Sequence, residues 1–350
     1  MRKVVRLGDV AKLAGVSVAT VSRVINSQKN VADETRNKVE DAIRKLDYNP
    51  HTIARNLATG RTGNILLYIV HEDPIEPSTW SYELPIVQGI CDYLNNTSFD
   101  LQVNMCSNRE FQQLGFLENR LKRQFFDGIL ILSSWMLERH VASELRRQQI
   151  PHVLIGCRDL DGESPSIESD NEGIVRELVG RLANLGHETF ALLGGDQNQL
   201  HMCDRLCGFQ LGLEDSGLPL WNRLVKHGDW SVESGYNQMK RLFAERRKPT
   251  AIICGNDYIA IGAMRAIEER GCRMPEDFVV TGFDDTIVVK LVTPSLTSVK
   301  LPLYRLGKLA AKRLVKALAV PEEEQGGRAL LPAEIVERAS TKHNRDETTA

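Results

Sequence analysis

The sequence predicts a small all-α domain at the N-terminus, followed by an α/β body built from two doubly wound subdomains. Apolar residues recur at helical spacing through the first 46 residues, and from residue 64 short apolar runs alternate with amphipathic stretches. The charge divides in the same way. Residues 1–61 hold 12 Lys and Arg against 6 Asp and Glu, a net of +6, while the remaining residues hold 32 against 40, a net of −8. A basic module on an acidic body predicts that the first part meets a polyanion.

Composition excludes several classes of protein. The 350 residues, 42% hydrophobic and 26% charged, fit a soluble globular chain that is too long for one ordinary core. No apolar run approaches the roughly 20 residues that cross a bilayer, and Asp9 and Lys12 interrupt the N-terminal apolar residues, so neither a membrane span nor a signal peptide is predicted. The seven cysteines are odd in number and scattered, which favours reduced thiols and a cytoplasmic location.

The first 46 residues contain three short helical segments. A helix over 7–14 is followed by Gly15 as a stop, and Ser17 is placed to cap a second helix over about 18–26. A third helix covers about 33–46. Two short helices joined around a glycine, with a third closing the core, predict a helix-turn-helix. The apolar faces expected in the core are Val21, Val24 and Ile25 on the second helix, and Val39, Ile43 and Leu46 on the third.

The exposed face of the second helix is small and polar, so it can enter the major groove of double-stranded DNA. Val18 and Ala19 would meet thymine methyl groups, and Arg23 can make a bidentate contact to guanine. A three-helix bundle for protein contacts is the alternative, which the net charge of +6 and the capped turn disfavour. Phosphate contacts are expected from Ser17, Thr20, Ser22 and Asn26.

The segment PHTIARNLATG, residues 50–60, has helix-forming composition but is too short to be a stable helix alone. It would become ordered only against a second copy of itself or against DNA. Leu57 lies beside Arg55 and Asn56, and an apolar side chain there fits a wedge inserted between base steps. The alternative is that Leu57 docks onto the body.

The body alternates apolar runs with helical stretches, which indicates parallel sheets covered on both faces. Its strands are too many for one doubly wound domain, and the polar, irregular segment 159–169 is a predicted crossing between two. The predicted strands are ILLYIV (65–70), LQVNM (101–105), GILIL (128–132), HVLIG (152–156), FALLGG (190–195), AIICG (251–255) and FVVTGF (278–283).

Ligands of open α/β sheets bind beyond the carboxyl ends of the strands, where this chain places polar groups. Asn256 follows one apolar run and Asp284 another. A turn after a third run leads to Arg205, and Trp230 stands ahead of a helical stretch over 231–245. An indole face with an arginine, an amide and a carboxylate suits a pyranose ring. Singly, each has a plain structural alternative: Trp230 in the core, Arg205 in a surface ion pair, and Asn256 and Asp284 as helix caps.

Catalytic and metal chemistry have little support in the sequence. His201, Cys203 and Cys207 lack a fourth ligand for a metal site. Asp284 and Asp285, as neighbours in an extended strand, would point to opposite faces and form no glycosidase pair. Walker A, GxGxxG and nucleophile-elbow motifs are missing. We therefore expect no enzyme activity, no metal and no cofactor.

Several long motifs resemble the lactose-repressor (LacI/GalR) family. LGDVAKLAGVSVATVSRVIN, VADETRNKVEDAIRKLDYNP and ARNL are similar to its headpiece and hinge, and GHETFALLGG, RLCGF, GDW, AIICGNDYIAIGAMRAI and VVTGFDDT to its effector domain. The resemblance implies a periplasmic-binding-protein-like core and hinge helices that pair across a dimer. It implies roles near DNA for Asn30 and Tyr48, close packing at Ala54 and a wedge at Leu57. It also implies effector contacts at Tyr82, Glu83, Arg205, Trp230, Asn256 and Asp284.

The chain departs from the family pattern in places. Glu83 is acidic where relatives place aromatic residues, and Gly156 replaces an acid. The stretch 71–80 has no family counterpart, and Ala32 stands where many relatives carry a capping serine. With Asp284, Glu83 favours a neutral sugar, because these acids would repel a sugar acid.

The expected organisation has four parts. Residues 1–49 form the helix-turn-helix domain and 50–61 the hinge helix. Residues 62–340 form the effector-binding and dimerisation core, and 341–350 a polar tail without the leucine heptads of tetrameric relatives. Within the core, the first subdomain covers about 62–167 and 301–328, and the second about 168–298 and 332–340. Crossings are expected near 167–169, 298–301 and 328–332.

The expected function is sequence-specific repression of carbohydrate-utilisation genes. A homodimer would bind a pseudo-palindromic operator in the bacterial cytoplasm, associated with the nucleoid, under the control of a small carbohydrate effector. Two alternatives stay open. The effector could strengthen rather than relieve operator binding, or the chain could be a cytosolic sugar-binding protein whose headpiece serves protein contacts.

The hinge interpretation predicts that Leu57→Ala weakens operator binding, because the substitution removes the wedge, while effector affinity stays unchanged. An electrophoretic mobility assay and a calorimetric titration measure the two quantities separately. Unchanged operator affinity in the variant would count against the wedge.

Overall fold

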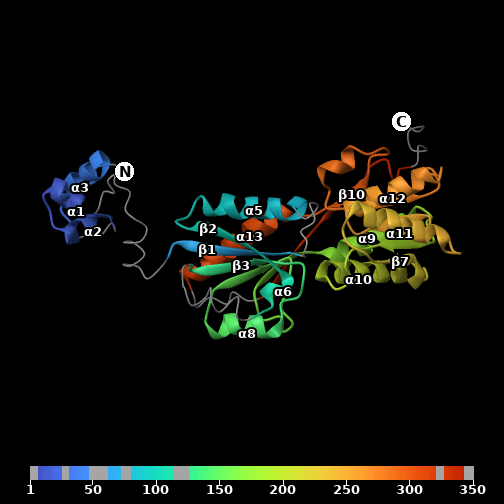
Figure 1. The fold of residues 1–350 in the computed structure, drawn as a ribbon, viewed down its shortest axis with the longest axis horizontal. Coiled ribbons are helices and arrows are strands. Elements are labelled where there is room, and N and C mark those ends of the chain that lie inside the picture. Colours follow the sequence, from blue (N-terminus) through green and yellow to red (C-terminus); the bar gives the residue numbers. More distant parts are fainter. Residues whose placement is uncertain are drawn as a thin grey trace. The chain divides into compact units, whose positions relative to one another are not determined.

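A computed structural model describes residues 7–25, 31–46, 62–71, 80–113, 126–320 and 327–342 of the 350. The chain divides into two units, residues 1–63 with 124–127 and residues 64–123 with 128–350. Figure 1 shows them in sequence colours. Within the described residues no helix combines the length and the apolar character needed to span a bilayer. All seven cysteines are free.

The N-terminal unit contains three helices, α1 (Leu7–Ala14), α2 (Val18–Ile25) and α3 (Asp33–Leu46). Gly15 ends α1 with a φ of +68°, which a glycine adopts without strain, and this turns the chain toward α2. The core prediction is correct for Val21, Val24 and Val39, which are buried. It is wrong for Ile25, Ile43 and Leu46, which are only half-buried, and it missed Ala42, which is buried. The fully enclosed residues are Val10, Ala11, Val21, Val24, Val39 and Ala42.

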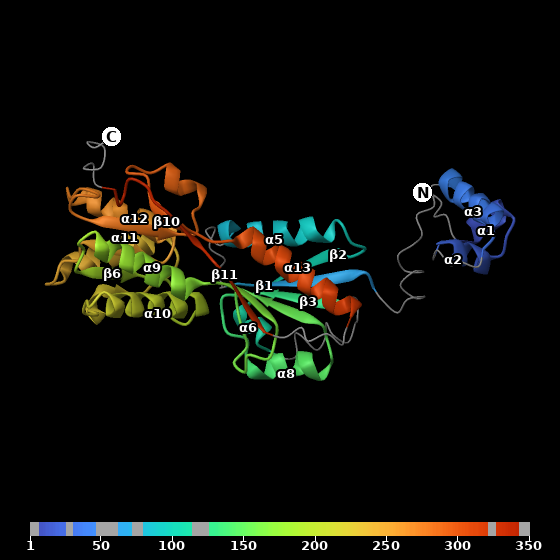
Figure 2. The same cartoon turned by 180° about the vertical axis from the view of Figure 1, so that it is seen from behind.

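The first subdomain of the body is built on a six-stranded sheet with the order β11-β5-β4-β3-β1-β2, in which every pairing is parallel. Helices α5 and α13 pack on each other, and α8 lies on the other side of the sheet, as Figures 1 and 2 show. The elements are β1 (Asn64–His71), α5 (Trp80–Leu94), β2 (Asp100–Ser107), α6 (Asn108–Phe111), β3 (Gly128–Leu132), α8 (Arg139–Arg147), β4 (His152–Ile155), β5 (Ser166–Ser169), α13 (Leu303–Ala319) and β11 (Arg328–Leu331).

The second subdomain has its own six-stranded sheet, in the order β12-β10-β9-β8-β6-β7, with only β12 antiparallel to its neighbour. Alternate strand residues go to opposite faces. Leu192 and Ile253 pack with α9 and α10, whereas Leu193 and Ile252 pack with α11 and α12. The elements are α9 (Asn171–Asn184), β6 (Phe190–Leu193), α10 (Leu200–Asp215), β7 (Val225–Lys226), α11 (Val232–Ala244), β8 (Ala251–Cys254), α12 (Asp257–Glu269), β9 (Val279–Phe283), β10 (Thr297–Lys300) and β12 (Glu334–Val336), with short 3₁₀ turns at Asn222–Leu224 and Ile287–Lys290.

The chain passes between the two sheets three times: between β5 and α9, between β10 and α13, and between β11 and β12. The fold class predicted from the sequence is thereby confirmed.

The predicted irregular segment 159–169 is partly wrong, because Ser166–Ser169 form the buried strand β5 between β4 and β11. Burying the carboxylate of Glu168 is possible because two arginines neutralise it. Arg158 approaches it to 2.6 Å and Arg328 to 2.9 Å. A strand whose polar residues are satisfied by distant partners carries no apolar pattern in the sequence.

A second correction concerns Tyr82 and Glu83, which the resemblance to the family would place before the first helix of the body. They lie inside α5, which begins at Trp80. Pro85 lies within the same helix, so α5 lacks one backbone hydrogen-bond donor at that position.

Candidate functional site

The first candidate site is the outer face of α2. Ser17 caps the helix by accepting a hydrogen bond of 3.1 Å from the Thr20 backbone N–H, and the two hydroxyl groups lie 2.9 Å apart. Val21 and Val24 are buried on the inner face. The residues predicted to meet DNA divide by exposure: Ser17, Val18, Ala19 and Arg23 are exposed, and Thr20 and Ser22 are half-buried.

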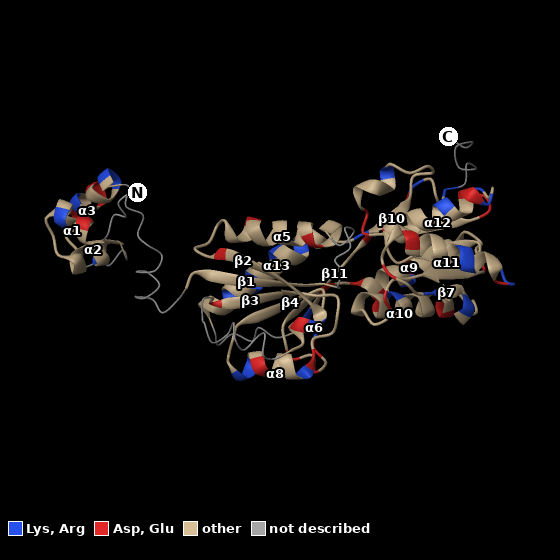
Figure 3. Cartoon of the chain, viewed as in Figure 1, with Lys and Arg blue, Asp and Glu red and all other residues tan. Residues whose placement is uncertain are grey.

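Arg23 is the only charged side chain on α2 (Figure 3). The first turn of the helix presents small side chains at its positive end, where phosphate oxygens are attracted. The face can therefore approach a polyanion closely and supply one guanidinium for recognition. Five other predicted contacts, Asn26, Asn30, Tyr48, Ala54 and Leu57, lie outside the described residues.

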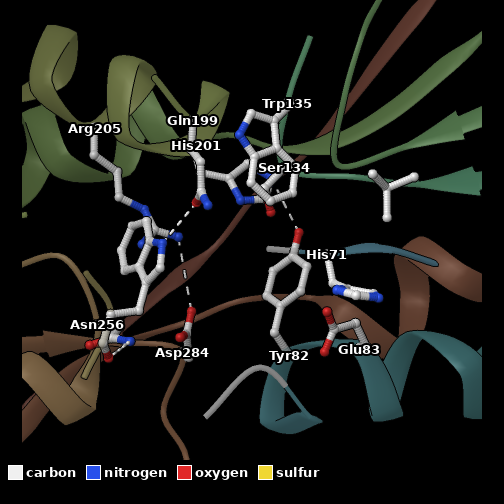
Figure 4. A pocket seen from close by; sticks show the side chains of 12 residues that line it. His71, Tyr82, Glu83, Ser134, Trp135, Gln199, His201, Arg205, Asn256 and Asp284 are labelled. Atoms are coloured by element: carbon white, nitrogen blue, oxygen red, sulfur yellow. Dashed lines mark hydrogen bonds and ion pairs between the residues drawn. The ribbon is translucent and has the colours of Figure 1, made fainter. Parts of the chain in front are cut away.

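The second candidate site is a pocket between the two subdomains, with about 610 Å³ of empty space including its mouth. Figure 4 shows residues of the first subdomain facing residues of the second. All six residues predicted to bind an effector line it: Tyr82, Glu83, Arg205, Trp230, Asn256 and Asp284. Six further lining residues were not predicted: Val70, His71, Ser134, Trp135, Gln199 and His201.

Arg205 organises the second-subdomain side of the pocket. Its side chain is only 3% exposed, its guanidinium carbon lies 3.8 Å from the centre of the Phe283 ring, and Nη1 donates to the carbonyl of Gly255. Nε donates to Asn171 over 2.9 Å, and Nη2 lies 3.9 Å from Asp284 Oδ1. The surface ion pair considered as an alternative is wrong, since the cation is buried and held by fixed partners.

The indole ring of Trp230 packs against the backbone of Gly195. A Cβ atom at Gly195 would overlap the ring, so only glycine permits this approach. Trp230 Nε1 donates to Gln199 Oε1 over 2.8 Å, which fixes the ring plane. Asn256 donates from Nδ2 to the Trp230 carbonyl and accepts the Ile259 N–H at 2.7 Å. Asn256 is therefore the N-cap of α12 and a pocket residue at once.

Asp284 and Asp285 are not in an extended strand, as the sequence analysis assumed. Their φ angles are +96° and +52°, so the chain turns sharply after β9. Asp285 binds Arg338 at 2.6 Å, whereas Asp284 faces Arg205. Burial raises the pKa of the Asp284 carboxyl. The two carboxylates serve different partners and do not act as a pair.

On the first-subdomain side, Gly156 leaves room for two rings. A Cβ atom there would lie 2.9 Å from the Tyr82 hydroxyl and 3.2 Å from His201 Nε2. His201 Nε2 lies 2.7 Å from the Gly156 carbonyl and 3.4 Å from the Tyr82 hydroxyl. Burial lowers the pKa of His201 to about 4, so it is neutral at pH 7. The absence of a side chain at Gly156 thus permits a tyrosine–histidine contact at this point of the pocket.

Several contacts tie α10 of the second subdomain to the first. The Leu200 N–H donates to the Ser134 carbonyl over 2.8 Å, and His201 contacts Gly156 as described. Arg158 donates to both carboxylate oxygens of Asp204, at 2.8 and 3.1 Å. Because of these contacts, a movement of one subdomain relative to the other would break or rearrange hydrogen bonds at the start of α10.

The possible metal ligands do not converge. His201 faces Gly156, while Cys203 is exposed and donates to the Gln197 carbonyl. In the part of the chain that the structure describes, no three His, Cys, Asp or Glu side chains form a group suited to a metal ion.

Comparison with known proteins identifies both units. Residues 6–51 match the model of bacterial regulatory proteins, lacI family, and residues 179–341 match a periplasmic binding protein-like domain. Catabolite control protein A of Priestia megaterium is 32% identical over 339 residues, which cover 97% of this chain and 99% of that protein. The chain belongs to the lacI family of bacterial regulatory proteins.

Two solved structures of this family extend the comparison. The lac repressor dimer bound to operator and the anti-inducer ONPF has a TM-score of 0.84 at 30% identity, over 97% of this chain and 99% of that chain. The complex of the transcriptional regulator CelR with cellobiose has a TM-score of 0.71 at 30% identity, over 96% and 99%. As a lacI-family member, the chain is a DNA-binding transcriptional regulator.

Some lining residues could have been found by the rule that located the others. Ser134 and Trp135 follow β3, and His71 ends β1, so all three stand at strand carboxyl ends. Gln199 and His201 gave no such signal, because they precede or begin a helix. Their role depends on how α10 meets the first subdomain.

Burial raises the pKa of the Glu83 carboxyl to about 8, so the native state holds this proton at pH values where an unfolded glutamate has lost it. The free energy of unfolding should therefore fall as pH rises from 5 to 8. Glu83→Gln removes this dependence, and its stability relative to wild type should increase over that range by about 2 to 4 kcal/mol. Urea denaturation at several pH values measures it, with the exposed Glu276→Gln as control. If the free energy of unfolding depended on pH in the same way in the wild type and in Glu83→Gln, burial would not raise the pKa of Glu83.

Proposed function

We propose that this lacI-family regulator is a repressor that binds an operator through α2 and is controlled by a small sugar in the pocket. One observation carries the proposal: a single chain combines a capped, polar helix face with a pocket of aromatic rings, a buried arginine and carboxyl groups. The relatives give it support, because the lac repressor is bound to operator and CelR to cellobiose.

On DNA, each residue of the outer face of α2 has a definite contact. Val18 and Ala19 meet thymine methyl groups, and Arg23 donates two hydrogen bonds to a guanine edge. The hydroxyl groups of Thr20 and Ser22 contact phosphates and set the register. The proposal requires no cofactor besides the effector, and its chemistry is binding rather than catalysis.

A second copy of the chain is the proposed partner. Large apolar side chains are exposed on both subdomains: Leu84 on α5 (63%), and Ile287 and Leu291 at the turn after β9 (71% and 75%). Val103 and Met105 are exposed on β2, the edge strand of the first sheet. A two-fold contact would bury these residues and present two headpieces to the two halves of an operator.

The effector acts through the contact between subdomains. A sugar that touches Trp230 and Asp284 on one side and Tyr82 on the other binds best when both sides are in place. It therefore shifts the equilibrium toward the arrangement in which α10 meets the first subdomain. The coupling equals the difference in effector affinity between the two arrangements, about 1–3 kcal/mol in comparable systems. Relief of repression is the proposed outcome, and increased operator affinity would identify a corepressor.

Recognition by α2 predicts that Arg23→Ala weakens binding to a duplex selected from a random pool by about 1–3 kcal/mol, because a guanine contact is lost. Binding to random duplex should change much less. Mobility assays across a salt series measure both, with the exposed Lys45→Ala on α3 as control. Equal losses on selected and random DNA would assign Arg23 to phosphate contact only.

The pocket predicts a separate phenotype. Arg205→Ala should abolish the response of DNA binding to whichever sugar raises the melting temperature of the wild type, because Asp284, Trp230 and Phe283 lose their common partner. Binding to the selected duplex in the absence of sugar should persist. The exposed Arg223→Ala is the control. A variant that still responds would place the effector elsewhere.

A further inference from the structure

Glu83 has an unusual position in the pocket. It lies in the first turns of α5, only 6% exposed, and its Oε2 has no hydrogen-bond partner among the described residues. A buried polar atom without a partner costs free energy unless something supplies one. Figure 4 shows the carboxyl at the pocket, beside His71 and Tyr82.

On the opposite side, Asp284 Oδ1 is also buried without a hydrogen bond, and lies 3.9 Å from the Arg205 guanidinium. Other polar groups of the lining already have partners: Arg205 donates to Asn171, and His201 contacts the Gly156 carbonyl. Of the lining atoms that the structure describes, Glu83 Oε2 and Asp284 Oδ1 are the buried ones left unsatisfied. A ligand that fills the pocket must hydrogen-bond at both ends.

The charges of the lining limit what that ligand can carry. Arg205 is the only Lys or Arg among the lining residues, and it lies beside Asp284 rather than beside Glu83. A carboxylate or phosphate placed against Glu83 would lose its water without gaining a Lys or Arg partner from the lining. Because the pKa of Glu83 is raised to about 8, its carboxyl is protonated at pH 7. Electrostatic repulsion by an ionised Glu83, expected from the sequence, is therefore not the mechanism.

A protonated carboxyl has both a hydrogen-bond donor and an acceptor. A sugar hydroxyl has the same pair of functions, so the two groups can satisfy each other. The aromatic side chains of Tyr82, Trp135 and Trp230 add apolar surface suited to the C–H faces of a sugar ring.

Building on the proposed function, we propose that Glu83 is a specificity-determining residue of this pocket: it binds a hydroxyl group of an uncharged, polyhydroxylated effector and rejects effectors that carry a carboxylate or a phosphate at that position. Asp284 accepts from a second hydroxyl on the far side, so the ligand spans both subdomains. Glu83 thereby makes the first subdomain part of the recognition of the sugar.

The test uses matched sugars on the full-length protein: glucose, glucose 6-phosphate, glucuronate and glucosamine, together with galactose, ribose, ribose 5-phosphate and cellobiose. Melting temperatures screen the panel and calorimetry measures affinities. At least one uncharged sugar should bind, and its phosphate or carboxylate counterpart should bind at least tenfold more weakly.

Variants separate hydrogen bonding from shape. Glu83→Gln keeps a donor and an acceptor at the same place and should lower the affinity for the uncharged sugar by less than about threefold. Glu83→Leu keeps the volume without polar atoms and should lower it by about tenfold or more. Circular dichroism and melting curves show whether each variant is folded, and Glu276→Gln is the exposed control.

Four results would overturn the proposal: tighter binding of a phosphate or carboxylate sugar, tighter binding of glucosamine than of glucose, unchanged affinity in Glu83→Leu, or no binding across the panel. None of these bears on DNA recognition. If the protein still binds one selected duplex in preference to random DNA, the proposed regulatory function stands while the assignment of Glu83 fails.

Discussion

Burial of one guanidinium governs the architecture of the pocket. A cation removed from water must be surrounded by acceptors and polarisable surface, and Arg205 finds them on separate segments: Asn171, the Gly255 carbonyl, Asp284 and the Phe283 ring. The ends of β8 and β9 are thus held together by a single side chain on α10. Breaking such an arrangement by removing one partner is costly, because the others stay buried. The ligand site is built from groups that the fold has already fixed.

A second buried carboxyl supports the same region. Asp257 accepts from Ser298 Oγ at 2.6 Å and from Thr286, through its N–H at 2.7 Å and its hydroxyl at 2.8 Å. Burial, and then the charge of Asp284, raise the pKa of Asp257 to about 7. These hydrogen bonds anchor the turn in which Asp284 takes a positive φ angle. The orientation of the pocket carboxylate therefore depends on a residue that is not part of the lining.

The sequence predicted the parts of the fold whose physics is local. Helical spacing placed α3 at its observed bounds, and the continuous apolar run GILIL placed β3. The rule of strand carboxyl ends located Asn256 and Asp284. The sequence left open whether Asn256 caps a helix or lines the pocket, and in the structure it does both. It gave no sign of β5, because the Glu168 carboxylate is compensated by Arg328, 160 residues away. The sequence could not predict His201 as a pocket residue either, since its position depends on Gly156 in the other subdomain.

The space above Gly156 has a consequence for how such a pocket diversifies. Tyr82, Gly156 and His201 come from three distant parts of the chain and share one small volume. Any larger residue at position 156 displaces one of the two rings, and shrinking a ring leaves a void that glycine cannot fill. A single substitution at any of the three positions therefore gives a protein whose pocket is either overpacked or contains a void. Substitutions at these three positions are therefore expected to occur together among related proteins rather than singly.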